Sequence, residues 1–243
     1  MNSSSFLGKC LLALTATLLL VSGVAQAQRE NSTSITAKVA CARIEQNLSV
    51  VCYLSAKTKG YEKLQLNVNH LSDPIKIKPD SNGMVHFYNP NDLPEKDKPA
   101  RPIASFKAST AKKGVLAILL PASRKSKAIY NVKLIDSNLK FNYGCSCIVN
   151  LTNKDLYLRE NDNKRSSKIL KGRASIVKFP NANKTVGIQF YAPHSQSKKV
   201  TRFYSATWSL GSDTRELCLV YQKPGKKWPR TKVISESKAL QLH

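Results

Sequence analysis

The sequence is poor in acidic side chains. Aspartate and glutamate total 15, against 39 lysines and arginines, and the formal net charge is +24. The few acids fall largely in segments rich in turn-forming residues, where carboxylates commonly serve the turns. The sequence therefore gives no support for the paired carboxylates of a glycoside hydrolase.

Motifs of other enzyme classes are also missing. The chain contains no Gly-x-Ser-x-Gly nucleophile turn and no Gly-x4-Gly-Lys phosphate loop. His194, in Tyr-Ala-Pro-His-Ser, has no recognisable acidic partner, and no pattern assembles a nucleophile, a base and a group that orients the base. We therefore expect a protein that is not an enzyme and has no cofactor.

Residues 28–243 lack long helical patterns. Short alternating apolar segments, such as Lys63–Val68, are separated by turn residues, which is typical of an all-β protein, and Met84–Tyr88 is a further predicted strand. Val115–Leu120 is apolar throughout, and such a run predicts a strand covered on both faces. No internal repeat is convincing, and Ser235–Leu242 is the one weak, short helical possibility.

The predicted strands divide into two groups. The small, basic segment Ala122–Lys127 is the candidate linker, although it could equally be a loop within one sandwich. With the linker there, residues 28–121 are predicted as an amino-terminal β domain and residues 128–243 as a carboxy-terminal immunoglobulin-like β-sandwich. The expected fold is all-β, with two small antiparallel β-sandwich halves that could equally merge into one larger β domain. Asn89–Pro102, with four prolines and six charged residues, is expected to be an exposed loop.

Residues 1–27 have the pattern of an export signal. Lys9 precedes an apolar run from Cys10 to Val24, and Ala25-Gln26-Ala27 supplies the small residues that a signal peptidase requires. The run is shorter than the roughly 20 residues that a membrane-spanning helix needs, so we expect cleavage after Ala27 and no transmembrane segment in the mature chain. The mature protein would be periplasmic or extracellular. Its charge would be +23, because Lys9 is the one charged residue that cleavage removes from the +24 chain.

The positive charge is spread over many short clusters. Such an excess attracts polyanions, although a specific nucleic-acid binder usually gathers its basic residues on one element. We expect an anionic envelope polymer, a lipid surface or another envelope protein as the partner, and no specific nucleic acid. Alternatively, these side chains maintain solubility and protect strand edges. The candidate binding residues, in predicted loops, are Lys112, Lys113, Arg124, Lys125, Lys164, Arg165, Lys198, Lys199, Lys226 and Lys227.

Five cysteines follow residue 27, which is an odd number for an oxidising compartment. Strands predicted at Ile35–Ile44 and Leu48–Ala56, joined by a two-residue turn at Gln46-Asn47, would set Cys41 opposite Cys52. Opposed residues of a hairpin are close enough for a disulfide. Alternatively, both are small core residues in a different register.

Cys145 and Cys147 lie two residues apart, so in a strand they point to the same face. Either could form a disulfide with Cys218 if the strands Cys145–Thr152 and Glu216–Gln222 are neighbours. The spacing of a zinc site is missing, so no metal site is predicted. A C-x-C pair could still hold a soft metal such as Cu(I) or take part in thiol redox chemistry.

A series of motifs in the carboxy-terminal half resembles a protein family. The motifs are Ala128-Ile-Tyr-Asn-Val-Lys-Leu-Ile-Asp136, Gly144, Ile148-Val-Asn-Leu-Thr152, Leu170-Lys-Gly172, Val186-Gly-Ile-Gln-Phe190, Trp208 and Arg215-Glu-Leu-Cys-Leu-Val-Tyr221. They resemble an uncharacterised family of exported bacterial β-sandwich proteins, and Ser49–Leu54 and Met84–Tyr88 extend the resemblance to the first half. The resemblance implies an exported location and a sandwich architecture, and no catalytic residues. From their residue types alone, Asn150 is expected to cap a turn and Trp208 to anchor the core.

These patterns predict a non-enzymatic, exported, strongly cationic β-sandwich protein that acts as a structural or binding module at the cell envelope. The competing prediction is a thiol-based redox or soft-metal-binding periplasmic protein that uses Cys145 and Cys147. The two predictions differ in whether these thiols are accessible and reactive.

Overall fold

A computed structural model describes residues 34–95, 97–108, 114–123, 125–136, 141–160, 166–178, 185–193, 199–209, 211–222 and 226–238. The named elements in these ranges are all β-strands, which confirms the predicted all-β class. In the same ranges, no helix is long and apolar enough to cross a membrane. The predicted export signal lies outside the described residues.

The amino-terminal half is a sandwich of two four-stranded sheets. We name β4-β1-β7-β8 the N-inner sheet and β3-β2-β5-β6 the N-outer sheet. Their facing sides enclose a core that includes Val39, Phe87 and Tyr130. The strands are β1 (Ile35–Cys41), β2 (Val50–Leu54), β3 (Tyr61–Gln65), β4 (Ile75–Ile77), β5 (Met84–Tyr88), β6 (Ala104–Lys107), β7 (Val115–Pro121) and β8 (Tyr130–Asp136).

The carboxy-terminal half is a second sandwich. The C-inner sheet has the order β12-β9-β15-β16, and the C-outer sheet has the order β11-β10-β13-β14. Leu158, Phe190 and Trp208 belong to the core between them. The strands are β9 (Cys145–Asn150), β10 (Leu156–Glu160), β11 (Ser166–Ile169), β12 (Ala174–Lys178), β13 (Thr185–Pro193), β14 (Val200–Ser209), β15 (Thr214–Tyr221) and β16 (Arg230–Ser237).

The two halves have the same topology. Adding eight to every strand number of the N-inner and N-outer sheets gives the orders of the C-inner and C-outer sheets. In each half the first strand pairs antiparallel with the fourth and parallel with the seventh. The inner sheets are therefore mixed, where the sequence predicted antiparallel pairing alone. The two halves therefore repeat the same strand order, although the sequence shows no convincing internal repeat.

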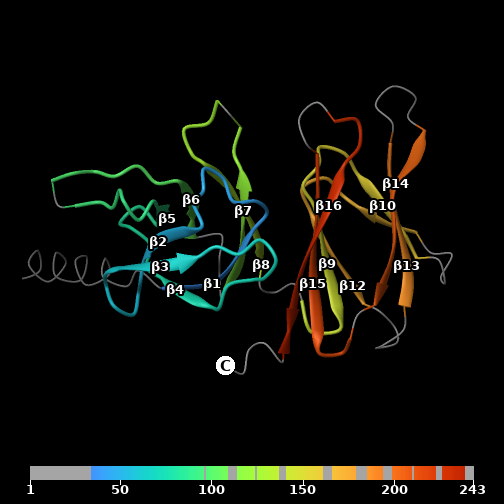
Figure 1. The fold of residues 1–243 in the computed structure, drawn as a ribbon, viewed down its shortest axis with the longest axis horizontal. Coiled ribbons are helices and arrows are strands. Elements are labelled where there is room, and N and C mark those ends of the chain that lie inside the picture. The colour runs from blue at the N-terminus through green and yellow to red at the C-terminus, as the bar shows by residue number, and fades with distance from the viewer. Residues whose placement is uncertain are drawn as a thin grey trace, which may run out of the picture.

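The two inner sheets pack against each other. A third apolar cluster joins Ala40, Leu116 and Ile118 of the N-inner sheet with Leu217 and Leu219 of the C-inner sheet. Figure 1 shows the result as a row of four layers, from the N-outer sheet through the two inner sheets to the C-outer sheet.

The burial of each strand follows from this layering. Val115–Leu119 of β7 and all of β9 are buried, because both faces of an inner strand contact another layer. Strand β13 of the C-outer sheet alternates between buried and partly exposed side chains. The prediction that Val115–Leu120 is covered on both faces is confirmed.

Two segments differ from the first interpretation of the sequence. Tyr130–Asp136 pairs along its length with Val115–Pro121, so residues 122–127 belong to a hairpin loop within the N-inner sheet and do not link two domains. Tyr130 belongs to the amino-terminal core, which is why this strand stays with the first half. The helix considered at Ser235–Leu242 is replaced, as far as Ser237, by the end of β16.

A partly buried ionic network crosses between the two inner sheets. The Glu236 carboxylate accepts hydrogen bonds from the Lys38 ammonium group and from Arg215 Nε, the latter at 2.6 Å. The Arg215 guanidinium lies 5.0 Å from the centroid of the Phe141 ring and 4.9 Å from that of Tyr143. Burial acts to raise the pKa of Glu236, but the hydrogen bonds from Arg215 and Lys38 outweigh it and lower the pKa below 4.5.

We expect E236Q to reduce the free energy of unfolding by about 2 kcal/mol at neutral pH, because it removes the charged acceptor of two hydrogen bonds. The folded-state pKa is lowered, so the carboxylate stabilises the fold above about pH 4.5, and this stabilisation is lost as the pH falls through the folded-state pKa. The difference from wild type should therefore shrink as the pH falls below about 4.5. Urea unfolding across this range measures it.

E45Q is the matched control, because Glu45 pairs with Arg43, whose side chain is 67% exposed. Exposed ion pairs contribute about 0–1 kcal/mol. An E236Q loss no larger than that of E45Q, or one that persists undiminished at about pH 3, would show that the network does not stabilise the contact between the halves.

Candidate functional site

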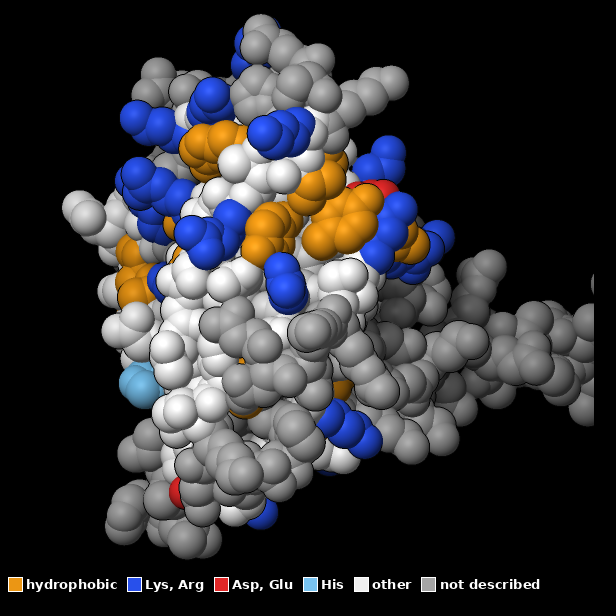
Figure 2. Space-filling model, turned by 90° about the vertical axis from the view of Figure 1, so that its right-hand side faces the viewer, with side chains coloured by type: hydrophobic (Ala, Val, Ile, Leu, Met, Phe, Trp, Pro, Cys, Tyr) orange, Lys and Arg blue, Asp and Glu red, His pale blue; other side chains and the backbone are white. Residues whose placement is uncertain are grey.

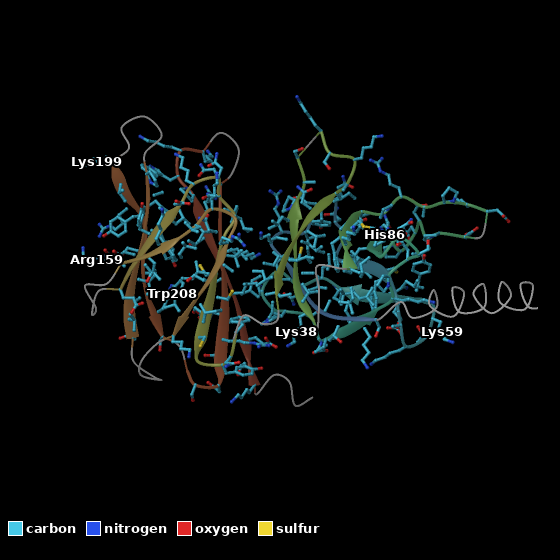
Figure 3. The ribbon with its side chains drawn as sticks, turned by 180° about the vertical axis from the view of Figure 1, so that it is seen from behind. Lys38, Lys59, His86, Arg159, Lys199 and Trp208 are labelled. Atoms are coloured by element: carbon cyan, nitrogen blue, oxygen red, sulfur yellow. The ribbon has the colours of Figure 1, made fainter. Side chains whose placement is uncertain are left out.

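Four of the ten predicted binding residues are described, and all four are exposed: Lys125, Lys199, Lys226 and Lys227. Lys125 lies in the β7–β8 loop, and Lys226 and Lys227 lie in the β15–β16 loop, which is the equivalent connection of the second half. Both loops are at the upper end of the molecule in Figure 1, and Lys199 is at the same end in Figure 3. The other six predicted binding residues lie outside the described residues, as does His194: Lys112, Lys113, Arg124, Lys164, Arg165 and Lys198.

A more regular array of basic residues lies on the solvent-facing side of the C-outer sheet. Leu158 and Phe190 point into the core of the second sandwich. Because side chains alternate along a strand, Tyr157, Arg159 and Tyr191 point away from the core. Figure 3 shows Arg159 at the outer side of this sheet and Trp208 closer to the interior of the molecule.

Strand register aligns these side chains in rows. Tyr157 lies opposite Lys168 on one side and Tyr191 on the other, and Tyr191 lies opposite Arg202. Directly opposed side chains are neighbours, with Cβ atoms about 4.5–5.5 Å apart in an antiparallel pair. Two adjacent tyrosines are thus flanked by a cation at each end, and we call this set of four residues the tyrosine row.

A second row runs beside the first. Arg159 lies opposite Ser166 and Gln189, and Gln189 lies opposite Ser205. The Tyr191 hydroxyl donates a hydrogen bond of 2.5 Å to Gln189 Oε1, which links the two rows. The second row therefore adds one cation and several hydrogen-bonding groups to the aromatic surface.

The charge on this face is largely positive. Lys168 pairs with Asp155 at 2.9 Å, and its hydrogen bond lowers the pKa of the Asp155 carboxyl. Arg159 and Arg202 are exposed, and none of the ion pairs between described residues engages either of them. Figure 2 shows basic side chains distributed around apolar ones on this side of the molecule. Such a surface can contact an extended anion through both charge and ring faces.

The predicted Cys41–Cys52 hairpin does not form. The turn at Gln46-Asn47 is present, with a hydrogen bond of 2.9 Å from the Leu48 amide to the Glu45 carbonyl. The strands on either side of it belong to different sheets, because β1 pairs with β4 and β7, whereas β2 pairs with β3 and β5. Both cysteines are buried and unpaired, so the expected disulfide is not seen.

The strands that carry Cys145, Cys147 and Cys218 are neighbours, as expected, but the thiols are unpaired. Cys147 packs in the cluster between the two halves, whereas Cys218 packs in the core of the second sandwich. The two thiols thus lie on opposite faces of the C-inner sheet, and no disulfide joins them. Burial raises the pKa of Cys147 to about 12, and it also raises the pKa of Cys218.

Two structural predictions are confirmed. Asn150 is fully buried, and its amide group donates to the carbonyls of Lys154 at 2.8 Å and Ile169 at 3.0 Å. Its Oδ1 accepts from the amide of Thr152 at 3.0 Å, so Asn150 caps the turn between β9 and β10. Trp208 is buried in the core of the second sandwich, with its ring 6.2 Å from that of Phe190.

We expect the five cysteines after residue 27 to be free and unreactive in the native state. Burial raises the pKa values of Cys41, Cys52, Cys147 and Cys218, which leaves little of these thiols as thiolate at neutral pH. All five thiols are buried, and burial blocks access to a reagent. A thiol-reactive dye should label less than about one equivalent in native protein, and all five thiols after unfolding in guanidinium without reductant. Rapid native labelling at Cys145 or Cys147, or fewer thiols in the unfolded sample, would contradict this expectation.

Comparison with known proteins does not assign the chain to a family. No protein-family model matches it, and no curated protein sequence matches it. The charge, register and burial of the chain itself therefore carry the functional proposal.

Proposed function

We propose that the protein is an exported binding module whose C-outer face engages an acidic polysaccharide of the cell envelope. The tyrosine row carries this proposal, because it sets two rings side by side with a cation at each end. Arg159, in the next row, extends the positive charge along the same face. Binding at this face requires no catalytic group.

The shape of the face favours a polymer over a small ligand. The rows cross four strands of one sheet, so they present an extended surface on which successive units of a chain can lie. A tyrosine offers an apolar ring and a hydroxyl, which suits a sugar ring with its apolar faces and its hydroxyl groups. Arginine and lysine can bind the carboxylate or sulfate groups of such a polymer.

The same face is less suited to inserting into a lipid surface. A membrane-binding surface needs a continuous apolar area. Among the described residues of this half, the large apolar side chains that are exposed are Leu170, which is 50% exposed, and Val200, which is 47% exposed. Leu170 directly follows β11 and Val200 is the first residue of β14, and these strands are at opposite edges of the C-outer sheet. A polyanion in solution therefore fits this face better than a bilayer.

The thiol-based alternative receives less support from the structure. All five cysteines after residue 27 are buried, and burial raises the pKa of Cys147 and Cys218. A reactive or metal-binding thiol needs access and a stabilised thiolate.

We expect R159Q/R202Q to weaken binding to polygalacturonate about tenfold at low salt, which corresponds to about 1.4 kcal/mol. The double substitution should also reduce the dependence of affinity on salt, because two charges leave the binding face. Titration of fluorescently labelled polymer at several salt concentrations measures both quantities. Anionic vesicles and duplex DNA are the comparison ligands.

K57Q/K59Q is the matched control, since it removes the same charge from exposed positions in the amino-terminal half. Figure 3 labels Lys59. It should change the affinity less than about twofold. Equal losses for the two double variants would mean that net charge alone attracts the polymer, and no binding at low salt would overturn the proposal. Tighter binding to vesicles or DNA would reject the polysaccharide as the partner.

The tyrosines should contribute a part of the affinity that salt does not screen. We expect Y157A/Y191A to weaken binding several-fold at both low and high salt, with little change in the salt dependence, because the two rings bind the polymer through apolar surface. Y61A removes a partly exposed tyrosine from the opposite half and serves as the control. A Y157A/Y191A protein with unchanged affinity at high salt would show that the rings do not touch the polymer.

A further inference from the structure

Three side chains of the amino-terminal half form a hydrogen-bonded chain. His86 of β5 lies directly opposite Ser105 of β6 in the N-outer sheet, and its Nδ1 is 2.7 Å from Ser105 Oγ. Its Nε2 is 3.1 Å from Oδ2 of Asp80, in the turn before β5. Figure 3 labels His86 in this outer layer. The chain therefore runs from a carboxylate through an imidazole to a hydroxyl.

The position and charge of Asp80 are fixed by the turn itself. Its Oδ1 accepts hydrogen bonds from the amides of Asn82 at 2.9 Å and Met84 at 2.7 Å. Burial acts to raise the pKa of Asp80, but these amides and His86 outweigh it and hold the pKa below its ordinary value. The carboxylate is thus ionised at neutral pH and can orient the imidazole.

The direction of each hydrogen bond follows from the ionised carboxylate. Asp80 can only accept, so the proton of the neutral His86 ring is assigned to Nε2. Nδ1 then carries the lone pair and accepts from the Ser105 hydroxyl. This arrangement of nucleophile, base and orienting acid is the one that activates a serine, with the two ring nitrogens exchanged relative to serine proteases.

Ser105 also lines a cavity of about 460 Å³ at the open edge of the first sandwich. Strands β6 and β8 end their respective sheets there and contact each other. The volume lies in the usual range for a small-molecule site. The lining includes Arg101 and Lys127, and the Arg101 guanidinium donates to the Lys127 carbonyl. No acidic residue is among the described lining residues, so the cavity favours an anionic ligand.

We propose that Ser105 is a nucleophile for a small ester with an anionic acyl group, activated by His86 and Asp80. Its hydroxyl proton moves to His86 Nδ1 as the Ser105 oxygen forms a bond to the acyl carbon. The ester bond then breaks, and the leaving alkoxide takes that proton from His86. Water then attacks the acyl carbon of the acyl-serine while His86 takes a proton from it. The bond to the Ser105 oxygen breaks, and His86 returns the proton to that oxygen, which restores the hydroxyl.

The two cations of the cavity have separate uses in this reaction. Arg101 and Lys127 are the cationic side chains of the lining. One of them can stabilise the negative charge that develops on the acyl oxygen, and the other can bind the carboxylate of the acyl group. We therefore expect an anionic acyl ester to react faster than a neutral ester of similar size.

The first experiment asks whether Ser105 reacts. Wild-type protein incubated with a fluorophosphonate probe should gain one adduct, located on Ser105 by peptide mass spectrometry. S105A should show no adduct, and H86Q should react at least about 100-fold more slowly, because glutamine cannot accept the proton. S209A, an exposed serine at the end of β14, should react like wild type.

The same experiment can also contradict the proposal. No adduct on the wild type, or an H86Q rate equal to that of wild type, would show that Ser105 is not activated. Thermal unfolding verifies that H86Q and S105A are folded. The test for an adduct on wild-type protein does not depend on the folding of these variants.

The second experiment tests the substrate class. The ratio of kcat/KM for the mono-4-nitrophenyl ester of succinic acid to that for 4-nitrophenyl butyrate should exceed about 10 in wild type and fall toward 1 in R101Q/K127Q. A ratio near 1 in wild type would reject the anionic ester as the substrate class, and absence of turnover with both esters would reject hydrolysis.

Discussion

Apolar contact between the two inner sheets is the interaction on which the rest of the structure depends. Each inner sheet covers the core of its own sandwich with one face, so its other face would be an exposed apolar surface in an isolated half. Packing them together removes both surfaces from water. The network centred on Glu236 adds a directional contact within this largely apolar layer. The two sandwiches therefore share one continuous apolar layer.

This central contact leaves the two outer sheets as the broad faces available to other molecules. The N-outer face carries the chain from Asp80 through His86 to Ser105, and the C-outer face carries the tyrosine row. Both depend on register between antiparallel strands, which sets opposed side chains at a fixed separation. Packed apolar layers lie behind each of these faces.

Local sequence patterns predicted much of the strand content and little of the pairing. Met84–Tyr88 is a strand with the predicted bounds, and Val115–Leu120 is covered on both faces as its composition indicated. The turn at Gln46-Asn47 also forms, but a turn does not specify whether the next strand stays in the same sheet. The turn therefore predicted that Cys41 and Cys52 lie opposite each other, whereas they lie in different sheets. The tyrosine row is assembled from four separate strands, and His86 meets Ser105 only through the β5–β6 register, so no local spacing could reveal either.

The shared topology of the halves has a consequence for symmetry. The two sandwiches meet through equivalent sheets, which in two separate, identical chains would be called an isologous contact. A homodimer of that kind must present the same surface at both ends, and any change in one face appears in the other. Joining the halves in one chain removes this requirement. One end can hold a serine and a histidine while the other holds paired tyrosines and arginines.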